Sequence, residues 1–137
     1  MRPAEAAAEL VRRRRARHSL LAFAQAVPIP GAPMPDDPDG WLFQPIETGL
    51  AHHHRILLEA VQRCLETRYG RLMVFMPPGS AKSIYCASVA PAWAMGRWPG
   101  YKVLGASYAD KPIHRCSRRC RQIVGSPEFR ALFGVSL

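Results

Sequence analysis

This chain of 137 residues lacks an apolar run close to the ~20 residues that a membrane-spanning helix needs. Its Arg-rich start is not followed by the apolar segment and cleavage site of a secretory signal peptide. It has only four cysteines, which in a chain without a signal peptide indicate reduced thiols rather than a disulfide framework. These absences predict a soluble cytoplasmic protein with no membrane partner.

Acidic residues are scarce as well. The chain has 10 Asp and Glu against 19 Lys and Arg, a formal net charge of +9. Such an excess favours polyanionic partners, either nucleic acid or nucleotide phosphates. Hydrophobic residues make up 48% of the chain, enough for the core of one ordinary domain.

The first forty residues differ in composition from the rest. Residues 1–26 are rich in Ala, Leu and Arg, which predicts a helix with a strongly basic face around Arg12–Arg17. Residues 27–40, "VPIPGAPMPDDPDG", contain five prolines, which predict a loop or linker without a packed element. We therefore divide the chain into a basic helical leader and linker, residues 1–40, and a domain, residues 41–137.

The pattern of that domain alternates helix and strand signals. Apolar residues at helical spacing predict a helix over 48–67 with Thr48 as its N-cap, and short apolar runs bounded by Gly and Pro predict buried strands. The expected order is helix 48–67, strand 71–76, helix 81–95 kinked or divided at Pro91, strand 101–108 and helix 110–124. This order predicts an α/β domain with parallel strands joined by right-handed crossovers.

The segment "MPPGSAKS", residues 76–83, joins the first predicted strand to a predicted helix. A phosphate-binding loop has the pattern Gly, four residues, Gly, Lys, then Ser or Thr, and here Met76 and Ala81 replace both glycines. The chemistry nevertheless needs only backbone N–H groups that converge on a phosphate, with an ammonium and a hydroxyl beside them. Gly79, Ser80, Ala81, Lys82 and Ser83 all keep their amides, so Lys82 is predicted to reach the β- and γ-phosphates and Ser83 to coordinate Mg²⁺.

A plainer interpretation of the same segment stays open. It is also compatible with a Pro-rich turn between a strand and a helix, in which Ser80 or Ser83 serves as an ordinary helix cap.

The run "RLMVFMPPGSAKSIYCASVAPAWAMGRWPGYKVLGASYAD", with "HHHRILLEA" before it and "SPEFRALFG" after it, resembles the N-terminal part of the large terminase subunit of tailed bacteriophages. The resemblance covers roughly residues 41–137. It implies an incomplete P-loop NTPase-type three-layer sandwich with ATP and Mg²⁺ as cofactors. It makes Lys82 the catalytic residue, with Gly79, Ser80, Ala81, Lys82 and Ser83 on the nucleotide. It also places His52–Arg55 near the adenine.

The resemblance further implies a function in viral DNA packaging within a bacterial cell. Double-stranded DNA, the small terminase subunit and the portal are the implied partners, and the full-length protein is expected to form a homo-oligomer. A strand ending in the acid that holds Mg²⁺ is missing, because only Asp110 follows a predicted strand and it is better placed to cap the next helix. No carboxylate cluster of a nuclease follows. We therefore expect a truncated fragment that binds ATP weakly and does not hydrolyse it.

An alternative from another class is a non-catalytic basic module that binds DNA or a packaging partner and holds no nucleotide. The arginines at 12–17 and those at 115, 118, 119 and 121 either contact DNA phosphates or form solvated helix faces. Three consecutive histidines, His52–His54, point about 100° apart on a helix and cannot all bind one ion. His114, Cys116 and Cys120 lack an evident fourth ligand, so ordinary thiols are expected there rather than a zinc site.

Overall fold

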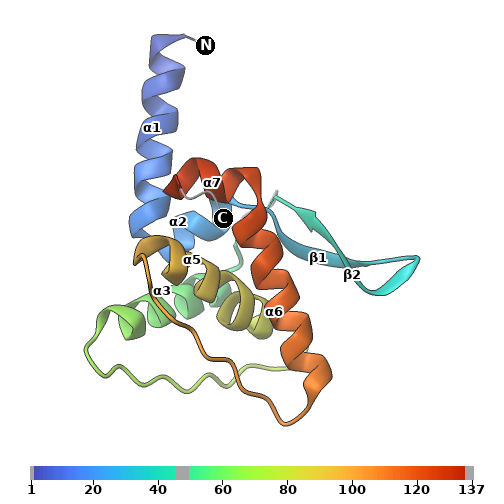
Figure 1. The fold of residues 1–137 in the computed structure, drawn as a ribbon. Helices are drawn as coiled ribbons and strands as arrows, with labels where there is room; N and C mark the ends of the chain where they lie inside the picture. The colour runs from blue at the N-terminus through green and yellow to red at the C-terminus, as the bar shows by residue number, and fades with distance from the viewer. Residues whose placement is uncertain (1, 46–49, 135–137) are drawn as a thin grey trace.

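The computed structural model describes residues 2–45 and 50–134, and these are mostly helical. In chain order the elements are α1 (Pro3–His18), α2 (Leu20–Ala26), β1 (Ile29–Met34), β2 (Asp37–Gln44), α3 (His52–Glu66), α4 (Lys82–Ile84), the π-helix η1 (Tyr85–Val89), α5 (Ala90–Arg97), α6 (Asp110–Gly125) and α7 (Pro127–Phe133). Figure 1 shows a bundle of helices from which α1 and the β1–β2 hairpin project. The predicted α/β sandwich is wrong, because the described residues form no parallel sheet.

The predicted helix over residues 1–26 is confirmed, with a break at Ser19. Pro3 opens α1, and the carboxylate of Glu5 accepts a hydrogen bond from the Arg2 amide at 2.9 Å. Ser19 ends α1 and caps α2, since its hydroxyl oxygen accepts from the Ala22 amide at 3.2 Å. The chain therefore turns sharply here, so that α2 enters the core while most of α1 stays outside it.

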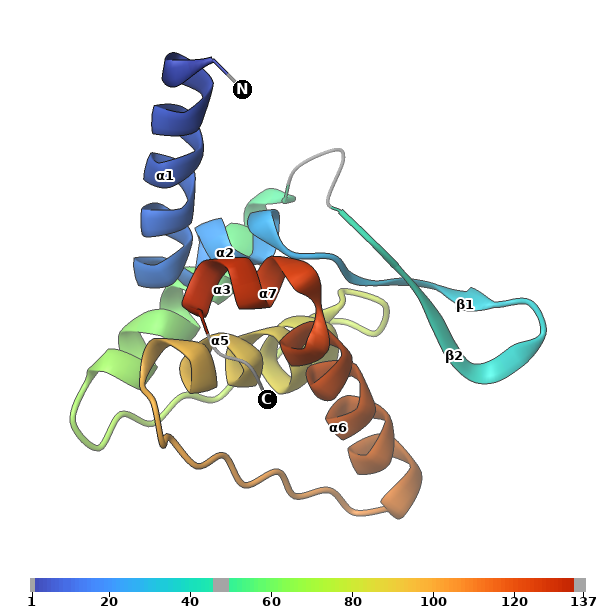
Figure 2. The same ribbon diagram turned by 45° about the horizontal axis from the view of Figure 1, so that its top comes forward.

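The core lies where α2, α3, η1, α5, α6 and α7 meet (Figure 2). Its largest fully buried side chains include Trp93, Phe23, Phe129, Leu58 and Ile123. The Phe23 and Phe129 rings meet edge to face at 6.1 Å, a favoured arrangement of aromatic pairs. Burial of these apolar side chains is the main force that holds the helices together.

Two polar side chains join the leader to this core. Gln62 of α3 accepts from the Leu20 amide at 2.9 Å and donates to the His18 carbonyl at 3.0 Å. The indole N–H of Trp93 donates to the Ala16 carbonyl at 3.1 Å. Both side chains satisfy backbone groups at the α1–α2 junction that the helices themselves leave without partners.

The prediction of an unstructured linker over residues 27–40 is wrong. The chain forms an antiparallel hairpin there, with Ile29 opposite Gln44 and Pro30 opposite Phe43, and its register shifts further along. Proline is compatible with this hairpin because a two-stranded ribbon has only edge strands. The guanidinium of Arg119, on α6, lies 3.7 Å from the centre of the Trp41 ring and fixes the hairpin to the bundle.

Both predicted strands of the domain are also wrong as sheet elements. Residues 71–76 and 101–108 are extended but unpaired, and they run along the outside of the bundle (Figure 1). Phe75 is 84% exposed and Leu104 is 96% exposed. An apolar run forms a buried strand only where a neighbouring strand and a covering layer exist, and no other described segment pairs with these two.

The remaining predicted helices are confirmed. The helix predicted over 48–67 is α3, although Ala51 is its N-cap and Thr48 lies outside the described residues. The helix predicted over 81–95 is the continuous run α4, η1 and α5, in which the Ala90 amide donates to the Tyr85 carbonyl five residues earlier. That π turn comes directly before Pro91, so the irregularity expected from the proline is present. The last predicted helix is α6, and none of the described helices is long and apolar enough to span a bilayer.

Candidate functional site

The predicted loop lies between the extended segment 71–76 and α4, at the surface of the bundle. Three donors converge on the Pro77 carbonyl: the Ser80 amide at 3.4 Å, the Ser80 hydroxyl at 2.7 Å and the Lys82 ammonium at 3.4 Å. These three hydrogen bonds to one carbonyl close the turn. The Lys82 side chain folds back over the loop instead of extending away from it.

Two residues of this loop have a positive φ. Gly79 has φ +79°, Ser80 keeps a negative φ, Ala81 has φ +56°, and Lys82 begins the helix. A left-handed residue followed by a right-handed one, as at Ala81 and Lys82, turns successive N–H groups toward one side, which is the geometry of an anion-binding concavity. Ala81 adopts this conformation at a cost of about 1–2 kcal/mol, which a glycine would avoid. Backbone strain of this kind is concentrated at functional sites.

The plainer interpretation of the segment holds for the Pro-rich turn before the helix but not for the serine cap. The helix begins at Lys82 with Ala81 as its N-cap, and no side chain caps it. The Ser80 hydroxyl donates to Pro77 instead of accepting from the helix, and Ser83 is exposed in the first turn. The N–H groups at this helix start are therefore not occupied by a serine cap.

His54, in the first turn of α3, contacts the loop from the side. Its Nε2 lies 3.1 Å from the Ser80 carbonyl oxygen, and its ring lies 4.8 Å from the ring of the buried Tyr85. Desolvation lowers the pKa of His54, which the hydrogen bond to Ser80 partly opposes and the neighbouring His53 reinforces. His54 is therefore predominantly neutral at pH 7, and its Nε2 donates to the carbonyl.

The structure brings the predicted binding residues together with partners that sequence reasoning did not foresee. Lys82 and Ser80 meet at the Pro77 carbonyl, whereas Ser83 points to solvent with no partner among the described contacts. The contact of His54 with Ser80 joins residues 26 positions apart, and no local pattern signals such a contact. Only the resemblance had placed the segment His52–Arg55 near a bound nucleotide, at its adenine.

No carboxylate site for a metal is formed by the described residues. Among them, no three His, Cys, Asp or Glu side chains are grouped to hold an ion, and this includes His114, Cys116 and Cys120. Burial raises the pKa of the Cys120 thiol to about 11. Asp110 was expected to cap the last long helix, but Ala109 is the N-cap there and no side chain caps that helix.

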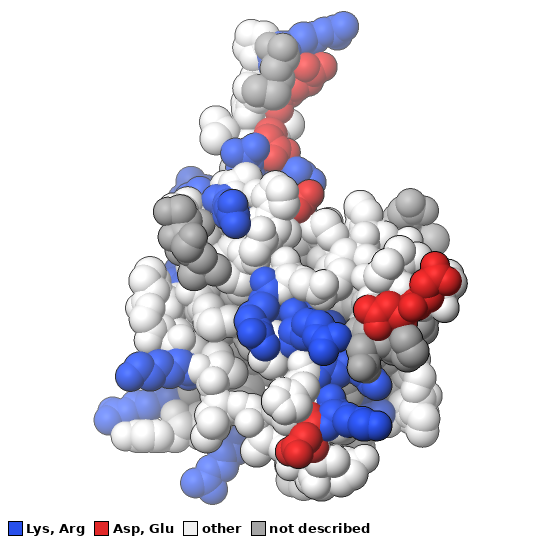
Figure 3. Space-filling view, turned by 45° about the vertical axis from the view of Figure 1, so that its right-hand side comes forward, with Lys and Arg blue, Asp and Glu red and all other residues white. Residues whose placement is uncertain are grey.

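A basic surface follows the exposed side of α6. Figure 3 shows Lys and Arg side chains gathered over this face of the molecule, with acidic side chains at its margins. A hollow of about 250 Å³ is lined by Asp110, Lys111, His114, Arg115 and Arg118. Arg119 differs from these residues because it is buried against Trp41, and its burial lowers the pKa of the guanidinium.

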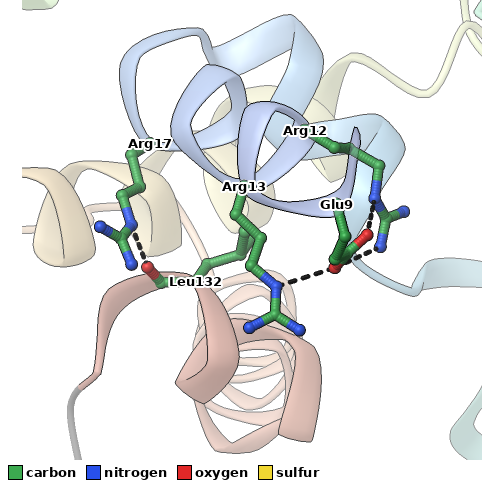
Figure 4. A network of polar contacts seen from close by, with 5 residues as sticks. All are labelled: Glu9, Arg12, Arg13, Arg17 and Leu132. Atoms are coloured by element: carbon green, nitrogen blue, oxygen red, sulfur yellow. Dashed lines mark hydrogen bonds and ion pairs between the residues drawn. The ribbon is translucent and has the colours of Figure 1, made fainter. Parts of the chain in front are cut away.

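The basic cluster of α1 is engaged largely within the protein (Figure 4). Glu9 binds Arg12 at 2.8 Å and Arg13 at 2.8 Å, and these hydrogen bonds lower the pKa of Glu9 to about 2. Arg17 donates to the Leu132 carbonyl and so ties α1 to α7. Three arginines of this cluster therefore have structural roles.

Comparison with known proteins adds no relative. No protein-family model matches this sequence, and neither the curated proteins nor the solved structures include a match.

Proposed function

We propose that residues 79–83 bind the phosphates of ATP with Mg²⁺, and that the chain is the ATP-binding N-terminal part of a phage large terminase subunit. The observation that carries the proposal is the loop itself. Gly79 and Ala81 have positive φ, Ala81 is followed directly by the helix that begins at Lys82, and the Lys82 ammonium is held over the same loop.

Each residue has a distinct role in this proposal. The amides from Gly79 to Ser83 would donate to the phosphate oxygens once the Ser80 amide leaves the Pro77 carbonyl, and the helix start adds a favourable dipole. The Lys82 ammonium would leave the Pro77 carbonyl, a neutral acceptor, for the charged β- and γ-phosphates, where its hydrogen bonds are stronger. The exposed Ser83 hydroxyl is available as a Mg²⁺ ligand. Mg²⁺ would neutralise phosphate charge when bound.

The partners of this function come from the resemblance quoted above. They are double-stranded DNA as the transported substrate, and the small terminase subunit and portal as assembly partners. In the whole protein, several copies would act together.

Titration with Mg·ATP tests the nucleotide site. Wild-type protein should bind saturably and only with Mg²⁺, and Lys82→Ala should weaken binding by at least about tenfold because a charge-assisted contact worth ~1.5–3 kcal/mol is lost. Lys102→Ala is a matched control, since Lys102 is exposed on the other extended segment. Equal binding by wild type and Lys82→Ala, or none by wild type, would refute the assignment. Phosphate release from the same samples tests the expectation that the chain does not turn ATP over.

The basic surface of α6 favours a second function, DNA binding through Lys111, Arg115 and Arg118. Each phosphate that these side chains neutralise should add about 0.9 to the slope of log affinity against log salt concentration. The triple change to glutamine should therefore reduce this slope by up to about 3, whereas Lys82→Ala should leave it unchanged. A slope that does not respond to the triple change would remove α6 as the DNA surface.

A further inference from the structure

We propose that His54 is a positioning residue for the phosphate-binding loop, because it holds the Ser80 carbonyl and so directs the Ala81 amide toward the anion. The inference rests on the proposed function, and it assigns to this site a residue outside the loop motif. His54 touches no reacting atom. It acts through the backbone.

The contact is specific. The carbonyl oxygen of Ser80 only accepts hydrogen bonds, so the Nε2 of His54, 3.1 Å away, carries the proton that is shared. The ring is held from its other side by Tyr85, which is 4% exposed and whose amide donates to the Ala81 carbonyl at 3.1 Å. The neighbouring His53 is exposed and contacts only the His54 ring among the described interactions. His54 is thus placed by α3 and by Tyr85 before any ligand binds.

Peptide planarity converts this contact into an orientation. The C=O of Ser80 and the N–H of Ala81 belong to one planar trans peptide, so they point in opposite directions. When His54 draws the carbonyl toward α3, the Ala81 N–H must point away from α3. That amide is central among the five donors proposed for the phosphates.

The same contact opposes a relaxation that Ala81 would otherwise undergo. Rotation of the Ser80–Ala81 peptide would move Ala81 from φ +56° to a negative φ, which its side chain prefers. It would also turn the N–H away from the phosphates. A glycine at position 81 would have no such preference, so the need for His54 follows from the alanine that replaces the usual glycine.

Two substitutions separate the hydrogen bond from the packing. His54→Phe keeps a ring against Tyr85 but removes the donor, and we expect Mg·ATP affinity to fall about fivefold, the value of one hydrogen bond. His54→Gln keeps an N–H donor at a similar reach, and its affinity should stay within about twofold of wild type. His18→Phe, which changes an exposed histidine at the end of α1, is the matched control and should bind as wild type does.

Rescue provides the decisive readout. The double variant His54→Phe with Ala81→Gly should recover wild-type affinity, because glycine adopts the left-handed conformation without help. A purely structural loss from His54→Phe would not be rescued by a glycine 27 residues away along the chain.

The backbone conformation of Ala81 is measured without nucleotide, by its NMR carbon shifts and amide coupling. We expect left-handed values in wild type and His54→Gln, and a shift toward extended values in His54→Phe. Unchanged Ala81 signals in His54→Phe would overturn the positioning role even where ATP binding is established. A shifted Ala81 in a protein that binds no ATP would instead support the role of His54 and refute the proposed function.

Discussion

Gly79 offers the most direct test of whether the loop conformation determines phosphate binding. Its φ is +79°, and a β-carbon added there would meet no atom within 4 Å. The change Gly79→Ala therefore introduces no clash with the rest of the protein. Only the backbone preference of the residue changes.

The expected magnitude follows from that preference. Alanine in the left-handed region is about 1–2 kcal/mol less favourable than in the right-handed region, which corresponds to about 5–30-fold in an equilibrium constant. Pro77, Pro78 and Gly79 are exposed, so the variant loop is free to relax when nucleotide is absent. Most of the penalty should then appear as weaker Mg·ATP binding and little as lower stability.

Gly100→Ala is the matched control. Gly100 has φ +83°, and a β-carbon there would also meet nothing within 4 Å, but it lies in the turn that follows α5. Both substitutions restrict the unfolded chain equally, by about 0.4–1 kcal/mol. Any difference in Mg·ATP affinity or stability between the two variants therefore comes from the folded protein, from the turn in which each glycine lies.

Calorimetric titration with Mg·ATP and denaturant unfolding should be measured on wild type and both variants. We expect binding to weaken 5–30-fold in Gly79→Ala only, by the free-energy difference given above. If the loop cannot relax, the loss should appear in the free energy of unfolding instead. If Gly79→Ala has the Mg·ATP affinity and the free energy of unfolding of wild type, the left-handed conformation at this position has no role in binding.

Two further predictions concern the core. Trp93→Phe should lower the free energy of unfolding, measured by denaturant titration, by about 2–4 kcal/mol. The change removes the hydrogen bond to the Ala16 carbonyl and leaves a gap in a fully buried site. A loss below about 1 kcal/mol would show that the indole N–H is not a structural donor. Cys120, with its pKa raised to about 11 by burial, should react with iodoacetamide at least about 100-fold more slowly than an ordinary thiol of pKa 9 in native protein and normally after denaturation. Peptide mass spectrometry resolves it from Cys64, and equal native labelling of the two would contradict its burial.

The helices were predictable from the sequence because their signals are local. Apolar spacing and good helix formers act within a few residues, and they located α1, α3 and α6. The ends of the helices were harder to predict, because the break at Ser19 depends on how α2 packs in the core. The hairpin was missed because proline density was taken to exclude pairing, although a two-stranded ribbon tolerates it.

The two predicted strands were wrong because strand formation depends on residues remote in sequence, whereas the helix signals are local. An apolar run such as residues 71–76 shows that a segment is suited to a buried strand, but a strand exists only when another segment supplies its hydrogen bonds. That partner is remote in sequence and leaves no trace in the run itself. The described residues supply none, and Met73, Phe75 and Leu104 are consequently exposed.

The loop at 76–83 depends on its surroundings less than the strands do, so its prediction as a phosphate-binding loop does not depend on the predicted sheet. An anion-binding concavity needs a left-handed residue at two positions and free amides after them, conditions that four or five consecutive residues satisfy by themselves. Ala81 is the exception, because an alanine does not hold that conformation without support. In our proposal its support comes from His54, on another helix, so this departure from the glycine pattern is a place where the loop depends on the tertiary structure.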